Sequence, residues 1–214
     1  MNAYNQARGI SGKAALALLL LALSLPAQAA TWRVDLIVFR YLRAVEEGGQ
    51  PAIAPSLRSA IELDEQQKLS AAGITILPDE EFGLRDHWAQ LRGSPQFRPL
   101  IRLAWTQNDP PDGQGPRLHL KSGETVTVPV ERGIGAREFN EIDGTIGLGL
   151  GRFLHLDADL VYTTVSVGEE ATSWRLAESR RMRSDELHHL DSPKLGIIAI
   201  VSKWEPALEG GGDH

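Results

Sequence analysis

Two apolar runs near the ends of the chain constrain its fold most strongly. In residues 34–39 the apolar side chains alternate between the two faces of an extended strand: Val34, Leu36 and Val38 on one face, Ile37 and Phe39 on the other. Residues 195–201 carry no polar side chain at all. Strands with this pattern are buried on both sides. We therefore expect the first and last strands of the folded chain to lie centrally, side by side.

The residues between these runs predict further strands and one principal helix. Residues 78–91 are the clearest helix, because Asp79 can cap its start and an apolar stripe follows: Phe82, Leu84, Trp88 and Leu91. Residues 65–72 predict a short helix ending at Gly73, before a short strand at 74–77. The expected fold is α+β, a mainly antiparallel β-sheet of about six or seven strands with one principal helix packed on it.

Strand periodicity continues through the second half of the chain. Strands are predicted at residues 97–105, 117–120, 126–130, 142–162 (one bent strand or a pair) and 174–183, where the pattern also allows a helix. A turn at Ser122 and Gly123 separates the second strand from the third. Gly144, Gly147 and Gly149 indicate bulges or close backbone approach, because they do not open a helix as a phosphate-binding loop would.

The first 29 residues are typical of a cleaved export signal. Arg8 and Lys13 precede an uncharged apolar core of about 12 residues, shorter than the roughly 20 that span a membrane. Ala27 and Ala29 then provide the small residues that a signal peptidase recognises, so we expect cleavage after Ala29. No later stretch is long enough to span a membrane. We expect residues 30–205 to form a single α+β domain in the periplasm, and residues 206–214 to form a flexible C-terminal tail.

Charge and cysteine content exclude several functions. The formal net charge is −6, and loss of the signal with its two basic residues makes it −8. This negative charge disfavours binding to nucleic acid or to anionic lipid, because both are negatively charged themselves. With 0 cysteines it can carry no disulfide, no lipid on an N-terminal cysteine and no thiol nucleophile.

Residues 179–197 concentrate charge and imidazole and form the candidate site. Arg180, Arg181 and Arg183 can each grip a carboxylate or phosphate with two parallel donors. Acids that could neutralise them lie close by: Asp185, Glu186 and Asp191. Either these arginines bind an anionic ligand from a hairpin loop, or they form an internal ion-pair cluster. If residues 174–183 form a strand, Arg180 points inward and needs a partner.

Histidines add a possible metal site to the same region. His188 and His189 follow the arginines, and His155, Asp157 and Asp159 share one face of the strand predicted at 152–162. Alternate side chains on a strand stand ~6.5–7 Å apart, so joint ligation needs a bend or distant partners. A solvated or ion-paired strand face is the simpler interpretation.

Four segments together resemble the CsiV family of exported peptidoglycan-binding proteins. They are residues 34–39, Arg152-Phe-Leu-His-Leu-Asp157, Arg180-Arg-Met-Arg-Ser-Asp-Glu-Leu-His188, and Leu190-Asp191 before Pro193. The family pattern has a tyrosine after the first histidine of the loop and a second histidine before the proline. This chain has His189 and Ser192 there, which argues against a metal site unless His189 reaches in from the other side of the loop.

The resemblance implies a periplasmic, non-enzymatic protein that binds peptidoglycan and supports a bifunctional wall synthase or its activator, with no cofactor and no metal. The candidate ligand-binding residues are Arg152, His155, Arg180, Arg181, Arg183, Glu186, His188, His189 and Asp191. Arg181 and Arg183 would bind the carboxylates of wall peptides, and Trp174 or Tyr162 would offer an aromatic face to glycan.

Two other functions stay open. One is a metal-dependent wall hydrolase, with His155, Asp157, His188, His189 and Asp191 converging, although no nucleophile motif or His-Glu-x-x-His helix is found. The other is a periplasmic scaffold that binds a protein through a sheet edge or through the histidine-rich loop.

Overall fold

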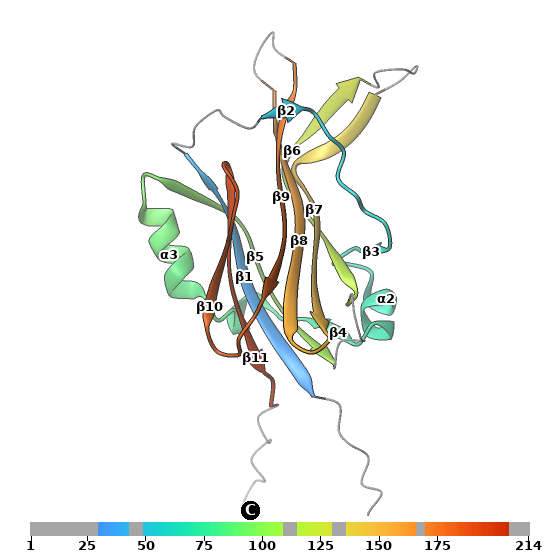
Figure 1. Ribbon diagram of the computed structural model, residues 1–214, viewed down its shortest axis with the longest axis vertical. Coiled ribbons are helices and arrows are strands. Elements are labelled where there is room, and N and C mark those ends of the chain that lie inside the picture. The colour runs from blue at the N-terminus through green and yellow to red at the C-terminus, as the bar shows by residue number, and fades with distance from the viewer. Residues whose placement is uncertain (1–29, 43–48, 109–114, 130–135, 166–169, 206–214) are drawn as a thin grey trace, which may run out of the picture.

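The computed structural model describes residues 30–42, 49–108, 115–129, 136–165 and 170–205. The expected export signal and C-terminal tail lie outside the described residues. Two antiparallel sheets form the body of the molecule, and helices lie at their margins (Figure 1). The predicted α+β class, mainly antiparallel with one main helix, is confirmed.

The first sheet has five strands in the order β10-β11-β1-β5-β4, every pair antiparallel. Its strands are β1 (Thr31–Tyr41), β4 (Ile74–Ile76), β5 (Phe97–Asn108), β10 (Leu187–Asp191) and β11 (Leu195–Lys203). The first and last long strands pair directly, from Trp32 opposite Lys203 to Arg40 opposite Leu195. The prediction from the two apolar runs is therefore confirmed.

The second sheet has six strands in the order β2-β9-β8-β7-β6-β3. Its strands are β2 (Gln50–Pro51), β3 (Ala60–Ile61), β6 (Arg117–Pro129), β7 (Ala136–Leu150), β8 (Leu154–Thr164) and β9 (Thr172–Arg181). All neighbours are antiparallel except β3 and β6. The expectation of one sheet with six or seven strands was wrong, because inward-facing apolar residues on both halves of the chain bury each other as two facing sheets.

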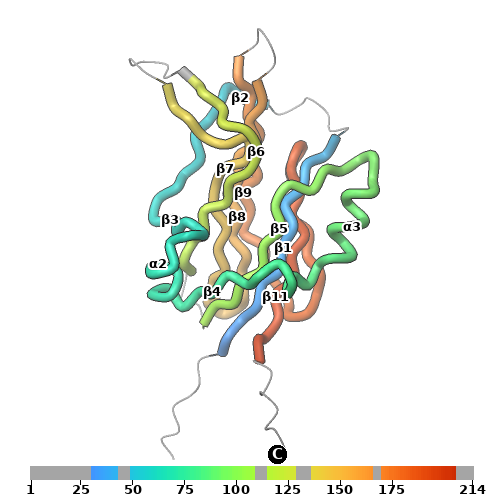
Figure 2. The backbone as a smooth tube through the Cα atoms, turned by 180° about the vertical axis from the view of Figure 1, so that it is seen from behind, coloured from blue at the N-terminus to red at the C-terminus, as the bar shows by residue number. Residues whose placement is uncertain are grey.

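The main core fills the space between the two sheets, which face each other in Figure 2. Val34, Leu36 and Val38 of β1 belong to the same core cluster as Leu156 and Leu160 of β8, and all five are fully buried. The opposite face of β1 contributes Ile37 and Phe39 to a second apolar cluster outside the five-stranded sheet. The structure thus confirms that the first strand is buried on both sides.

The helix that covers this second cluster is shorter than the sequence predicts. α3 spans Arg85–Gly93, and Asp79–Glu81 form a separate 3-10 turn, η1. The buried carboxylate of Asp35 accepts a 2.6 Å hydrogen bond from the Gly83 backbone N–H, which holds the chain extended between the two elements. Asp79 does not cap the helix and binds Arg102 instead.

One further boundary differs from the predictions. The strand β6 runs through Ser122 and Gly123 with a register shift instead of a turn, because the long strand β7 pairs with both of its halves and Gly123 adopts a φ of 84°. The short helix α2 (Gln66–Ala71), the positive φ of Gly73 and the strand β4 follow the predicted order.

Gly144 of β7 has the predicted role. A Cβ at Gly144 would lie 2.1 Å from the carbonyl oxygen of Asp159, so the two backbones approach closely there. The structure resolves residues 142–162 as a pair of strands, β7 and β8, with alternating burial along β8. His155, Asp157 and Asp159 share its outer face, as predicted.

Candidate functional site

The arginine-rich segment connects the two sheets. β9 belongs to the six-stranded sheet and β10 to the five-stranded sheet, so residues 182–186 cross from one sheet to the other. The expected hairpin is therefore wrong, because β10 pairs with β11 and not with β9. Met182 is buried within the crossing and anchors it to the core. The polar side chains on either side of Met182 are left at the surface.

None of the three arginines is buried in an internal ion-pair cluster. Arg180 lies 3.6 Å from Glu178 with its side chain 49% exposed, and Arg183 lies 3.6 Å from Glu186 with its side chain 74% exposed. Arg180 does share the inward side of β9, opposite Leu156, but its half-exposed side chain reaches solvent. Long, exposed pairs of this kind contribute little stability, ~0–1 kcal/mol. The guanidinium groups thus keep donors for a ligand.

Arg181 stacks on an exposed aromatic ring that the sequence analysis missed. Its guanidinium carbon lies 3.3 Å from the centre of the Phe153 ring, and that of Arg152 lies 5.4 Å from the same ring. The ring itself is 37% exposed. Stacking orients a guanidinium and leaves its edge donors free. The sequence feature that could have indicated this ring is the pair Arg152-Phe153 just before the strand β8.

The two aromatic residues expected to face glycan are buried instead. Trp174 and Tyr162 stack on each other in the core, with ring centres 5.8 Å apart. They occupy inward positions opposite each other on β8 and β9. Phe153 is the aromatic surface that the structure places near the arginines.

Five of the predicted site residues line one pocket. It has a volume of about 540 Å³ and is lined by Glu178, Ser179, Arg180, Arg181, Arg183, Glu186, Leu187 and His188. We call it the arginine pocket. His188 orders its rim, because the Nε2 atom accepts a 3.0 Å hydrogen bond from the Arg183 backbone N–H. The Nε2 atom of His188 is therefore already occupied by a hydrogen bond within the loop. His155 flanks the pocket, directly opposite Arg181 across the β8–β9 ladder.

His189 and Asp191 do not line the arginine pocket, although the Asp191 backbone N–H donates a 3.4 Å hydrogen bond to Glu178, which does. His189 stacks on Phe39 with ring centres 5.9 Å apart, and its Nε2 atom lies 3.3 Å from the Tyr41 hydroxyl. Burial, and then a hydrogen bond from the hydroxyl to Asp191, raise the pKa of Tyr41. His188 and His189 therefore serve opposite faces of β10, because adjacent side chains on a strand point apart.

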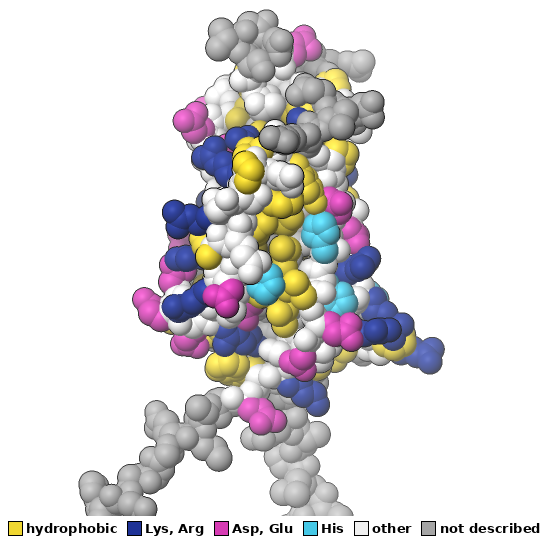
Figure 3. All heavy atoms as spheres, turned by 90° about the vertical axis from the view of Figure 1, so that its left-hand side faces the viewer, with side chains coloured by type: hydrophobic (Ala, Val, Ile, Leu, Met, Phe, Trp, Pro, Cys, Tyr) yellow, Lys and Arg dark blue, Asp and Glu magenta, His cyan; other side chains and the backbone are white. Residues whose placement is uncertain are grey.

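An apolar strip accompanies His189 on the outer face of the five-stranded sheet. Leu187 is 47% exposed, and Ile198 and Ile200 are partly buried beside the second apolar cluster. Figure 3 shows histidine and apolar side chains adjoining one another on this face. We call Leu187, His189, Ile198 and Ile200 the β10 strip.

The convergence that a metal-dependent hydrolase needs is not found. Within the described ranges, no three His, Asp or Glu side chains are grouped closely enough to hold a metal ion. Ser192 closes the turn into β11 through hydrogen bonds with Leu195, where the family pattern has a histidine. His189 does not take over that position.

A second polar cluster is centred on the buried His119 of β6, which pairs with Thr145 of β7. His119 lies between two carboxylates: its Nδ1 contacts Glu62, and its Nε2 lies 2.7 Å from Asp143. Lys121 adds a 2.9 Å contact to Glu62. The His119 hydrogen bond, followed by Lys121, holds the pKa of Glu62 below its ordinary value of 4.5 despite some desolvation. This cluster ties the segment before α2 to β6 and β7, which is a structural role.

A model of the CsiV peptidoglycan-binding protein family matches residues 13–204. The chain belongs to the CsiV family. The family is described as peptidoglycan-binding, which supports a binding role and a place in the cell envelope. No curated protein and no solved structure matches the chain.

The CsiV match spans all four segments that carry the resemblance, including the arginine-rich one. None of the described helices is long and apolar enough to cross a membrane. The described part of the chain forms a sandwich of two sheets, with the arginine pocket at the crossing between them.

Proposed function

We propose that this CsiV-family protein binds peptidoglycan through the arginine pocket. The observation that carries the proposal is the arrangement of Arg180, Arg181 and Arg183, exposed together around one pocket and held only by long contacts or by an aromatic ring. Peptide stems of the wall carry free carboxylates. A guanidinium binds a carboxylate with two parallel, charge-assisted hydrogen bonds.

Phe153 has a defined part in the proposed site. Its ring holds Arg181 extended over the end of β8 and leaves apolar surface for the carbon face of a sugar. Arg152 approaches the same ring from the β7–β8 turn. Peptide carboxylates and glycan would then meet adjacent parts of one surface.

Sedimentation with purified sacculi tests the proposal. The double variant Arg181→Ala and Arg183→Ala should bind sacculi at least about tenfold more weakly, because two charge-assisted pairs are lost. A matched control is Arg92→Ala with Arg137→Ala, which removes the same charge from exposed positions outside the pocket. If the folded pocket variant pelleted as well as the parent, the proposal would fail.

The proposed role is non-enzymatic and periplasmic, in support of a bifunctional wall synthase or its activator. The family description as a binding protein and the predicted export signal support it. The β10 strip favours a second candidate function, a scaffold that binds such a protein, because exposed apolar residues mark many protein contacts. Crosslinking from position 187 separates the two roles, since a scaffold gives a protein adduct and wall binding alone gives none.

A further inference from the structure

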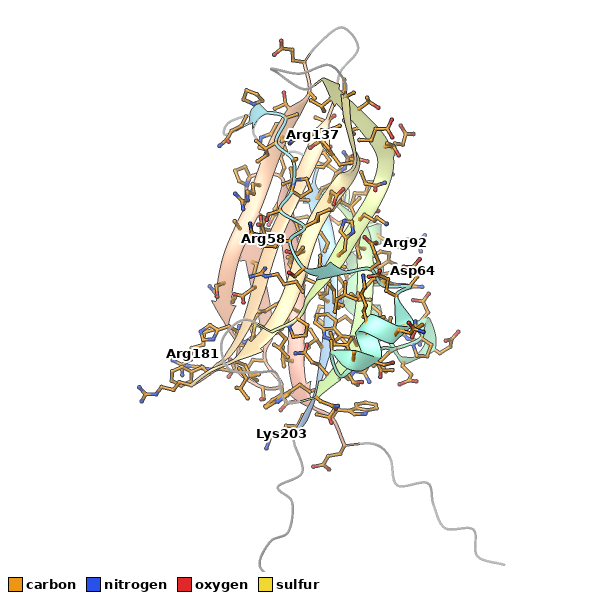
Figure 4. All side chains as sticks on the ribbon, turned by 90° about the vertical axis from the view of Figure 1, so that its right-hand side faces the viewer. Arg58, Asp64, Arg92, Arg137, Arg181 and Lys203 are labelled. Carbon is orange, nitrogen blue, oxygen red and sulfur yellow. The ribbon has the colours of Figure 1, made fainter. Side chains whose placement is uncertain are left out.

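Residues 52–59 cross the outer face of the six-stranded sheet as a strap. β2 pairs with β9 at one edge of the sheet, and β3 pairs with β6 at the other edge. The inner face is covered by the five-stranded sheet, so the connection runs over the outer face (Figure 4). Hydrogen bonds fix the start of the strap, since the backbone N–H groups of Ala52 and Ile53 donate to Ala171 and Ser173.

The strap ends in a tight turn that presents Arg58. The Ala60 N–H donates to the Leu57 carbonyl at 3.1 Å, and Ser59 adopts a φ of 58°. Figure 4 shows Arg58 over the middle of the sheet, while Arg181 projects from the lower end of the same face. Arg58 is therefore held above the strands by its backbone.

A polar pocket of about 490 Å³ lies between the strap and the sheet. Its lining is Ser56 and Arg58 from the strap, and Arg117, Thr145, Asp157, Ala158, Asp159, Ala177, Glu178 and Ser179 from the sheet. We call it the strap pocket. Glu178 and Ser179 also line the arginine pocket, so the two pockets adjoin along β9.

A glycine separates the opposite charges on the pocket floor. Arg117, Gly147, Asp157 and Ser179 stand in one cross-strand row on four neighbouring strands. Neighbouring strands lie ~4.8 Å apart, so the backbones of Arg117 and Asp157 are about 10 Å apart, with no side chain from Gly147 between them. Space for a small ligand group is left between a guanidinium and a carboxylate.

The charges that face this space are not paired with each other. In the part of the chain that the structure describes, neither Arg58, Arg117 nor Asp157 forms a salt bridge, and Arg117 makes only a long 3.5 Å contact to Thr145. Asp159 differs, because Arg175 binds it through two hydrogen bonds of 2.7 Å. Glu178, the remaining acid of the lining, stands opposite the buried Ala158 on the inward side of β9 and lies 3.6 Å from Arg180. On the outer side of the sheet the strap pocket therefore has two cationic donors and one carboxylate acceptor available.

We propose that the strap pocket binds a zwitterion, an amino-acid residue with a free ammonium group and a free carboxylate. Arg58 and Arg117 bind the carboxylate, and Asp157 binds the ammonium group. A polyanion would be repelled by Asp157, and a neutral sugar would leave all three charges without a partner. The assignment of this zwitterion to a wall peptide rests on the proposed function, whereas its recognition by charge does not.

Calorimetric titration with free meso-diaminopimelate tests the zwitterion site. We expect binding to the parent to weaken by at least about tenfold in Asp157→Asn and in Arg58→Gln, each of which removes one charged partner. Asp64→Asn and Arg92→Gln are matched controls outside the pocket and should bind within about twofold of the parent. Acetylation of the ligand's amines should weaken binding to the parent about as much as the pocket variants do. Esterification of its carboxylates should weaken binding by a similar factor.

Several outcomes overturn this inference. They are no binding by the parent, equal binding by folded pocket variants, or equal binding of the blocked ligands. Sedimentation with sacculi, run in parallel, separates the two proposals. Zwitterion binding without sacculus binding would contradict the proposed function and support the strap pocket, and sacculus binding without zwitterion binding would do the reverse.

Discussion

At the scale of single residues, the candidate site depends on what holds each arginine in place. Arg180 and Arg183 have acidic neighbours at 3.6 Å, whereas Arg181 lies on the Phe153 ring. A ring orients a cation without neutralising it. Arg181 is therefore the guanidinium best prepared to bind an anion.

Phe153→Ala should weaken binding to sacculi without unfolding the protein. An exposed cation–π contact contributes about 0.5–1 kcal/mol, so we expect a loss of about two- to fivefold. Phe153→Leu is the control for apolar volume and should recover only part of the loss, since it lacks a π face. Sacculus sedimentation at several protein concentrations measures both variants, and parent-like binding by Phe153→Ala would contradict the role of the ring.

Glu62→Gln should reveal a pH-dependent contribution to stability. The folded protein holds the pKa of Glu62 below 4.5, so the stabilisation is fully present above that value and is lost as the pH falls through the lowered pKa. Glu62 is partly exposed, so its contribution near neutral pH is about 1 kcal/mol or less.

Urea unfolding at pH 7 and at pH 3 checks this expectation. The difference in free energy of unfolding between the parent and Glu62→Gln should shrink on acidification. A difference that stays constant between the two pH values would contradict the carboxylate pairing with His119 and Lys121.

At the scale of elements, the crossing between β9 and β10 determines the geometry of the arginine pocket. The Asp185 N–H donates to the Val201 carbonyl at 2.9 Å, which attaches the crossing to the central strand β11. Asp185 has a φ of 64°, a conformation that aspartate tolerates and β-branched residues do not. The loop is thus held by its backbone rather than by its charges.

Asp185→Val should lower the free energy of unfolding by about 1–2 kcal/mol and weaken sacculus binding, because a β-branched residue disfavours a positive φ. Asp185→Gly removes the same carboxylate and keeps the conformation accessible, so its binding should stay near that of the parent. Denaturant unfolding and sedimentation measure both effects. Equal losses in the two variants would point to the carboxylate instead of the backbone.

The sequence predicted most elements but not which sheet each would join. Alternating or continuous apolar patterns gave β1, β5, β8 and β11 because burial dictates those patterns directly. The helix boundary near Gly83 and the continuous β6 depended on partners distant in sequence, Asp35 and β7. The arginines and His188 were identified from residue type, whereas Phe153 and the strap pocket required knowledge of which strands are neighbours.

At the scale of the whole molecule, the fold depends on the pairing of its first and last long strands, β1 and β11. β1 and β11 are adjacent inner strands of one sheet, and the Trp204 N–H donates to the Thr31 carbonyl just beyond them. The two pockets lie on the other sheet and on the connection that leads back to β10. Loss of the last strand should therefore abolish both sites together.

Truncation after Glu205 should leave the thermal midpoint within about 2 °C of the parent, since all described hydrogen-bonded strands are kept. Truncation after Lys194 removes β11, which lies between β10 and β1. That variant should show no cooperative unfolding by circular dichroism. A folded protein without residues 195–214 would contradict the central position of the last strand.

The most direct test of the central claim is to map where a soluble wall fragment binds. Backbone amide resonances would be followed by NMR while a disaccharide-peptide from digested sacculi is added. We predict that the largest shifts fall on residues 152–155 and 178–188, around Arg181 and the arginine pocket. Shifts confined to α3 and β5, or no shifts at saturating fragment, would contradict the claim.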